Sequence, residues 1–162
     1  MRFATCLIFL LLTSTHAVAL HQCIEKEERI FSFETKTKKI LSLCKGTGGV
    51  YLVLRLGTRA GIDLQYPERL DASSWQQFSF ESRHEAGTKP NTGFSNHLLT
   101  FLHGDAAYAL SQDWDGADGR YAIVLEVERG GKTFSFKGLR ASQEGSLLLL
   151  EAESDKLQNM AD

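Results

Sequence analysis

The sequence predicts a mainly β protein, either a single antiparallel β-sandwich or a small β-barrel built of hairpins. Three observations support this class. Short runs alternate apolar and polar side chains with a period of two. Glycine-containing or polar turns separate these runs at short intervals. The chain has only two prolines. About nine strands of five to nine residues joined by short loops favour a sandwich or a closed barrel.

The clearest hairpin spans residues 119–138. Its turn at 129–132, Arg-Gly-Gly-Lys, is typical of a tight connection between antiparallel strands. Apolar side chains occupy every second position on both sides of this turn and define one face of the hairpin: Tyr121, Ile123, Leu125 and Val127, then Phe134 and Phe136. This face is expected to lie against the core.

The first 19 residues are typical of a secretory signal peptide. Arg2 precedes the apolar run 3–12, and small residues end the segment at 17–19. The mature chain is therefore expected to begin at Leu20, with cleavage after Ala17 as the alternative. A membrane anchor is disfavoured because about ten apolar residues span only about 15 Å as a helix, half the hydrocarbon core.

Residues 20–162 then form a single β-rich domain of ordinary size. Loss of Arg2 changes the formal net charge from −2 to −3. This weakly acidic balance disfavours nucleic acid and anionic membranes as partners. The mature chain is expected to lack a transmembrane segment and to be periplasmic or secreted.

Two cysteines, Cys23 and Cys44, remain after Cys6 is removed with the signal peptide. In an oxidising compartment they are expected to form a disulfide. A disulfide that closes a loop of this size should stabilise the fold by roughly 3 kcal/mol. Two free buried thiols are the alternative. A hairpin turn at 35–38 would place Cys44 opposite Arg29, so residues 24–28 must curl back for the bridge to form.

The remaining elements follow from the same alternation. Arg55 lies in an otherwise apolar row, so it is expected at the sheet margin or paired with an acid. The four leucines at 147–150 begin a predicted short C-terminal helix over 147–160, with a last strand at 146–150 as the alternative. The other predicted strands cover residues 30–34, 39–44, 50–56, 62–66, 75–82, 97–103 and 106–110.

Several of these strands resemble a group of uncharacterised exported proteins of Gram-negative bacteria. The likeness is carried by residues 33–36, by Lys-Ile-Leu-Ser-Leu-Cys at 39–44, by Tyr-Leu-Val-Leu-Arg-Leu-Gly at 51–57 and by Leu-Gln-Tyr-Pro at 64–67. It implies a secreted β-rich domain and no activity. The group often has cysteines where this chain has Phe33 and Phe136, so a second disulfide is absent here.

No motif predicts a catalytic residue, a metal site or a cofactor. The sequence has no Gly-x-Ser-x-Gly, and His84-Glu85 does not begin a zinc-binding His-Glu-x-x-His motif because position 88 is threonine. His97 and His103 are six strand residues, about 20 Å, apart and cannot share one ion. The acidic stretch 113–119 departs from a calcium loop at Ala117, so an acidic turn is expected, with weak calcium binding as the alternative.

The candidate binding residues are His84, Lys89, Phe94 and Trp114. The first three lie in residues 83–96, the longest stretch without a periodic pattern, and such long loops are usually functional or disordered. Phe94 is expected either to anchor a partner or to fold back onto the sheet. Trp114 is either a binding aromatic or half-buried packing at a strand margin.

These features favour a non-enzymatic binding or inhibitor-type module whose partner is a periplasmic or extracellular protein. Two alternatives remain from the sequence. One is a hydrolase with a catalytic site dispersed over loops, and the other is a structural or assembly component of the cell envelope.

Overall fold

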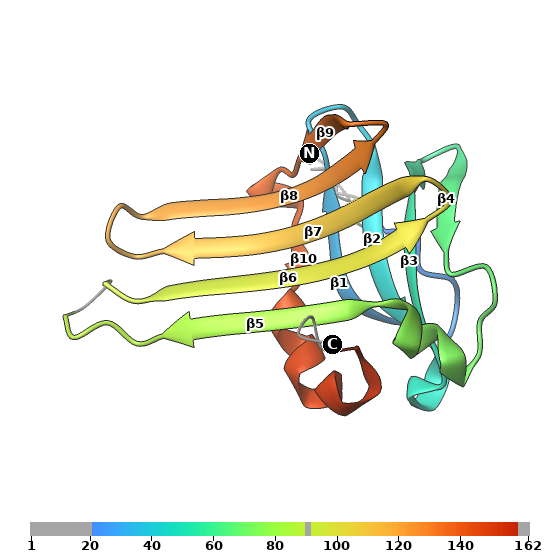
Figure 1. The fold of residues 1–162 in the computed structure, drawn as a ribbon, viewed down its shortest axis with the longest axis horizontal. Coiled ribbons are helices and arrows are strands. Elements are labelled where there is room, and N and C mark those ends of the chain that lie inside the picture. Colours follow the sequence, from blue (N-terminus) through green and yellow to red (C-terminus); the bar gives the residue numbers. More distant parts are fainter. Residues whose placement is uncertain (1–20, 90–91, 159–162) are drawn as a thin grey trace, which may run out of the picture.

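The fold is a sandwich of two antiparallel five-stranded sheets (Figure 1). A computed structural model describes residues 21–89 and 92–158. The predicted signal peptide and the mature start at Leu20 lie outside these residues. The two sheets do not close into a barrel in the described part of the chain, so the sandwich prediction is confirmed.

The first sheet has the order β10-β1-β2-β3-β4, and the second has the order β5-β6-β7-β8-β9. Each sheet is a meander of neighbouring strands, except that β10 returns from the end of the chain to pair with β1. The strands are β1 (Glu28–Glu34), β2 (Ile40–Lys45), β3 (Leu52–Thr58), β4 (Gly61–Tyr66), β5 (Ser79–Glu85), β6 (Phe94–His103), β7 (Ala106–Asp115), β8 (Arg120–Arg129), β9 (Lys132–Lys137) and β10 (Glu144–Gly145). Four 3₁₀ helices complete the fold: η1 (Thr47–Gly49), η2 (Ala72–Gln77), η3 (Arg140–Ser142) and η4 (Leu147–Lys156).

The core lies between the sheets and follows from the period-two patterns. One register row of the second sheet contributes Phe80, Leu99, Leu110 and Leu125, all buried. The first sheet contributes the buried side chains of Phe31, Phe33, Leu41, Leu43 and Leu54 to the same core. The predicted hairpin at 119–138 is confirmed as β8 and β9. Its two-residue loop places Gly130 and Gly131 at positive φ, as a hairpin turn of this length requires.

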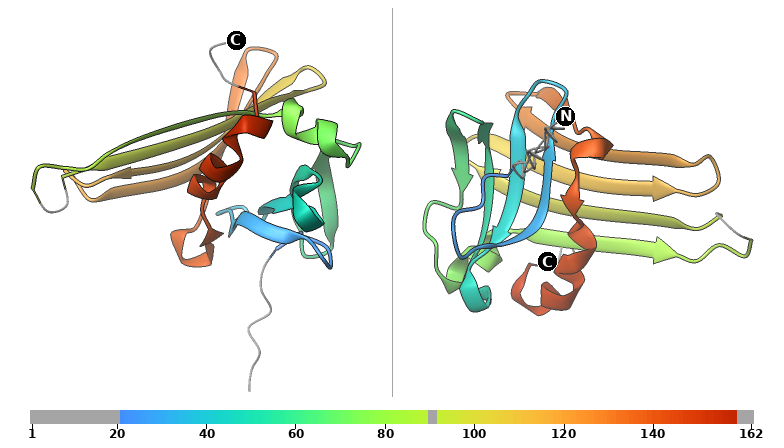
Figure 2. Two further views of the ribbon diagram at one scale, coloured as in Figure 1. Left: turned by 90° about the horizontal axis from the view of Figure 1, so that it is seen from below. Right: turned by 180° about the vertical axis from the view of Figure 1, so that it is seen from behind.

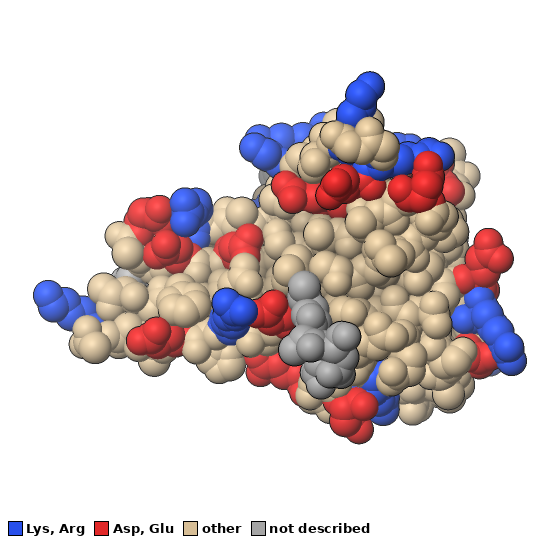
Figure 3. Space-filling model, in the orientation of Figure 1, with Lys and Arg blue, Asp and Glu red and all other residues tan. Residues whose placement is uncertain are grey.

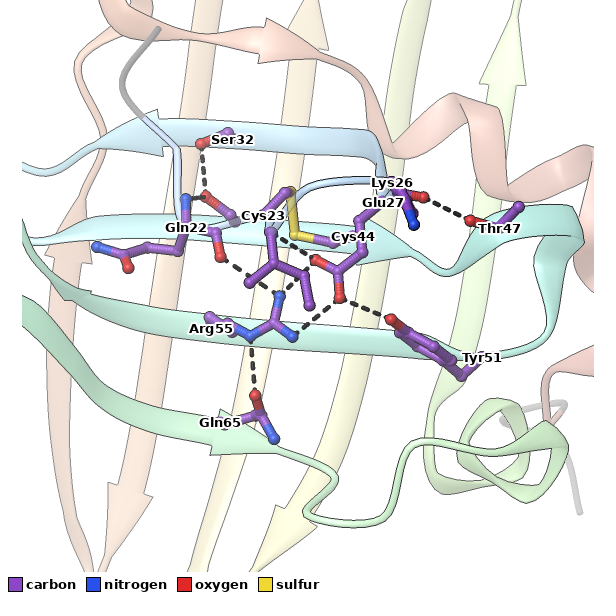
Figure 4. A network of polar contacts seen from close by, with 12 residues as sticks. Gln22, Cys23, Lys26, Glu27, Ser32, Cys44, Thr47, Tyr51, Arg55 and Gln65 are labelled. Atoms are coloured by element: carbon purple, nitrogen blue, oxygen red, sulfur yellow. Dashed lines mark hydrogen bonds and ion pairs between the residues drawn. A yellow bond between two sulfur atoms is a disulfide. The ribbon is translucent and has the colours of Figure 1, made fainter. Parts of the chain in front are cut away.

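A polar network holds residues 22–27 against the outer face of the first sheet (Figure 4). The predicted disulfide joins Cys23 to Cys44. Arg29 is opposite Cys44 in the strand register, so the residues before β1 curl back as expected. Arg55 is buried and forms an ion pair with Glu27, which confirms the paired alternative for this arginine.

The strand predicted at 75–82 is wrong in its first part. The side chain of Asp71 accepts a hydrogen bond from the Ser73 amide and begins η2, so strand β5 starts only at Ser79. Trp75 is nearly fully buried within η2 and donates its indole N–H to the Gly49 carbonyl, 3.1 Å away. The helix-capping preference of aspartate therefore outweighs the alternating aromatic pattern at this point.

The predicted C-terminal helix is present as the 3₁₀ helix η4. Ser146 caps its start by accepting a hydrogen bond from the Leu148 amide. Leu147, Leu150 and, just beyond η4, Leu157 are buried, and the first two are separated by one turn of a 3₁₀ helix. Residues 159–162 lie outside the described part of the chain.

The second sheet is longer than the first. Strands β6, β7 and β8 each have ten residues, whereas β1 to β4 have six or seven. At about 3.4 Å per residue the longer strands extend about 10 Å further. Figures 1 and 2 show that their far ends project beyond the first sheet.

Candidate functional site

The projecting part of the second sheet is here called the arm, and it consists of residues 82–85, 94–97, 112–115 and 120–123. Residues 83–96 are therefore not one long loop: β5 continues to Glu85, β6 begins at Phe94, and only 86–93 connect them. These strand ends lack the alternation of apolar and polar residues that predicts a strand, because their side chains are mostly polar. Main-chain pairing needs no apolar alternation where both faces of a sheet meet water.

The inner face of the arm, which is the face on the core side of the sheet, brings together two of the predicted binding residues. Strand register places His84 opposite Ser95, Ser95 opposite Trp114, and Trp114 opposite Tyr121. These four side chains therefore form one row across β5 to β8. His84 and Trp114 are two strands, or about 10 Å, apart.

The other two predicted binding residues lie elsewhere. Phe94 belongs to the next row, which faces the opposite side of the sheet, and its side chain is 42% exposed. Lys89 is exposed in the connection 86–93, where its amide donates to Thr92 Oγ1 over 3.1 Å. The four predicted residues thus do not form one site, because neighbouring residues of a strand point to opposite faces.

The row of the arm next to the core is mostly polar. Register aligns Ser82, His97 and Gln112 on the inner face with Ile123, which belongs to the core. His97 is 2% exposed, and this burial lowers the pKa of its imidazole. The negative charge of Glu151 acts in the other direction and raises this pKa, but by less. Ser82 Oγ lies 2.8 Å from His97 Nδ1 and also donates to a carboxylate oxygen of Glu151.

This Ser–His–Glu cluster differs from a hydrolytic triad. In a triad the carboxylate orients the second nitrogen of the histidine, whose first nitrogen takes the serine proton. Here Glu151 contacts the serine and, at 3.4 Å, Nδ1 of His84. The cluster therefore fits an anchor for η4 on the arm. Glu151 was not predicted as a site residue, since it is 69 residues from Ser82 in the chain.

The segment that follows β9 is anchored to the root of the arm by Tyr121. Its hydroxyl donates to Gln143 and accepts from Gln112, 3.0 Å away. The guanidinium of Arg140 lies 4.3 Å from the centre of the Tyr121 ring. Gln112 Oε1 also accepts a hydrogen bond from the Leu147 amide over 2.7 Å. Beyond these contacts Figure 2 (left) shows no second layer of secondary structure beneath the arm.

Among the described residues, one group of three side chains is close enough together to hold a metal ion. This group is Cys23, Glu27 and Cys44, and its two sulfurs are bonded to each other. In the acidic stretch 113–119, Asp115 and Asp118 accept backbone hydrogen bonds from their own turn and pair with Arg120 at 3.5 and 3.7 Å. The expected acidic turn is therefore present at 116–119, and residues 113–115 belong to the end of β7.

No protein-family model matches the chain, and no curated protein and no solved structure is significantly similar to it. Within residues 21–89 and 92–158, none of the helices has the length and apolar character needed to cross a bilayer.

Proposed function

We propose that this protein is an exported, non-enzymatic binding module that contacts a partner protein through the inner face of the arm. The observation that supports this proposal is the row of His84, Ser95 and Trp114 on strands that extend past the opposing sheet. The fourth member of the row, Tyr121, is partly covered by Arg140.

The row has the composition of a recognition surface. Tryptophan and tyrosine offer large apolar area together with a polar group, and they are enriched at interfaces and among residues that dominate binding energy. Trp114 and Tyr121 are directly opposite each other on paired strands. Their backbone positions are fixed by strand pairing, so little backbone freedom remains to be lost on binding.

The disulfide is consistent with the proposed location. Structural disulfides persist in oxidising compartments such as the periplasm and the extracellular space. Together with the expected signal peptide, the Cys23–Cys44 bond favours a partner in one of these compartments.

Capture of a partner by the immobilised mature chain from periplasmic extract or culture medium would test the proposal. Trp114→Ala should weaken binding of the captured protein by about 2 kcal/mol, or roughly thirtyfold in Kd. His84→Ala should weaken it less. Phe94→Ala is the matched control, since it removes a partly exposed aromatic ring from the other face of the same arm.

Melting temperatures of the three variants separate binding from folding. The proposal requires Trp114→Ala to keep a melting temperature near that of the wild type while capture is lost. If Phe94→Ala abolishes capture and Trp114→Ala does not, the contact lies on the outer face and the inner-face proposal is wrong. Enrichment of the protein in envelope fractions regardless of these variants would favour the structural alternative.

A further inference from the structure

A groove of about 510 Å³ lies on the second sheet away from the arm. Its position is at the end of the sheet where β6 turns into β7, near the start of β5. Its lining includes Thr100, Leu102, Ala107, Ala109, Glu126 and Glu128. Its volume is within the range of ligand sites in proteins.

The floor of the groove consists of small side chains on the outer face of β6 and β7. Thr100 is opposite Ala109, and Leu102 is opposite Ala107. Leu102 is 73% exposed, the largest exposed fraction among the large hydrophobic residues of the described chain. Because the neighbouring side chains are short, the backbone of an extended segment can approach this part of the sheet closely.

The wall on the side of β8 is acidic. Glu126 and Glu128 are both exposed on the outer face, and two strand residues separate them by about 7 Å. Their cross-strand neighbours on β7 are Ala109 and Ala107, and neither carboxylate forms an ion pair with a described residue. By contrast, Arg129 at the end of the same strand pairs with Asp105 at 2.9 Å.

Charged side chains of the groove lining are limited to Glu126 and Glu128. Figure 3 views the outer face of this sheet: its broad part is mostly uncharged, and along the upper margin acidic side chains lie beside basic ones. On the other side, the wall is formed by the neutral side chains of Gln76, Gln77 and Gln158. The lining residues therefore carry two negative charges and no positive charge at pH 7.

We propose that this groove binds an extended basic segment of a partner protein, with Lys or Arg at alternate positions. Alternate side chains of an extended chain on one face are about 7 Å apart, which matches the spacing of Glu126 and Glu128. The aliphatic stems of these side chains fit beside the exposed Leu102. This site is separate from the inner face of the arm and does not depend on the function proposed for that face.

A labelled eight-residue peptide of alternating lysine and threonine is the probe, since threonine favours an extended backbone. A peptide with the same residues in two blocks, four lysines and then four threonines, is its control. Fluorescence polarisation with the mature protein should show tighter binding of the alternating peptide. The affinity should fall as salt is added, because exposed charges are screened.

The double variant Glu126→Gln and Glu128→Gln should weaken binding about tenfold, the sum of two exposed charge contacts. A control double variant, Glu25→Gln and Glu85→Gln, removes the same net charge from exposed positions outside the groove and should change Kd less than twofold. Ala107→Leu fills the floor without changing charge and should also weaken binding.

Three results would overturn the proposal. One is the absence of peptide binding. Another is equal weakening by the two double variants, which would indicate attraction to the bulk charge of the protein. The third is equal affinity for the alternating and block peptides combined with no effect of Ala107→Leu.

Discussion

Replacing Glu27 by glutamine should destabilise the fold strongly. The Glu27 carboxylate accepts hydrogen bonds from the Ile24 amide at 2.9 Å and the Tyr51 hydroxyl at 2.9 Å. It also accepts two from the Arg55 guanidinium, at 2.6 and 2.9 Å. The side chains of Glu27 and Arg55 are 1% and 2% exposed. Glu27→Gln preserves the shape but leaves the charge of Arg55 buried and uncompensated, which costs about 3–5 kcal/mol.

The matched control is Glu144→Gln, which removes the partner of Arg29 in an ion pair whose side chains are about one-third exposed, 29% and 35%. An exposed pair of this kind contributes less than about 1 kcal/mol. Urea unfolding at pH 7 with the disulfide intact gives the free energy of unfolding of each variant. If Glu27→Gln costs no more than Glu144→Gln, the network in Figure 4 does not stabilise the fold.

The pH dependence gives an independent test of the same carboxylate. Burial alone would raise the pKa of Glu27, but hydrogen bonds from Arg55, the Ile24 amide and Tyr51 hold it below its ordinary value. A lowered pKa in the folded state means that this stabilisation is present above the unfolded pKa, about 4.3, and is lost as the pH falls through the folded value. The stability difference between wild type and Glu27→Gln should therefore shrink on acidification below about pH 4. A constant difference would show that the carboxylate is not ionised in the fold.

Other predictions concern the covalent structure and one close backbone contact. Thiol titration of the unfolded, unreduced mature chain should find no free thiol, and reduction of Cys23–Cys44 should lower the free energy of unfolding by about 3 kcal/mol. Two reactive thiols per chain would disprove the bond in solution. The intact mass of exported protein should correspond to a chain beginning at Leu20, and a mass that retains residues 1–19 would contradict the signal peptide. Gly57→Ala should cost about 2 kcal/mol or more because a Cβ there would lie 2.2 Å from the Gly61 carbonyl oxygen. Gly61→Ala, whose Cβ meets nothing within 4 Å, should cost much less, and equal melting temperatures would refute the reasoning.

The parts of the fold that the sequence predicts are those specified by local patterns. The alternation around Gly130 and Gly131 predicts the hairpin of β8 and β9. Ile123 and Leu125 of the predicted core face are buried, whereas Phe134 of the same face is 51% exposed. The pair of cysteines predicts the disulfide once an oxidising compartment is assumed. The position of Arg55 in an apolar row predicts a partner, although the pattern does not identify Glu27.

The composition of the candidate site depends on contacts between distant residues, so the sequence predicts little of it. His84 and Trp114 share one face only because two strand pairings set their register. Phe94 has the same aromatic character as Trp114, but its position in the register places it on the other face. Period-two patterns assign faces within a strand and do not fix which strands become neighbours.

The mostly polar row at the root of the arm explains why the sheet can extend without a second layer. A continued apolar face would have to be buried. The polar side chains of this row instead form hydrogen bonds: Ser82 bonds to His97 and Glu151, and Gln112 bonds to the Leu147 amide. Ile123, the apolar member of this row, still belongs to the core. In the next row Tyr121 packs against the core, whereas Trp114 is not among the core residues. Trp114 remains only partly buried. Because Trp114 is not among the core residues, Trp114→Ala tests the proposed recognition role with little expected effect on folding.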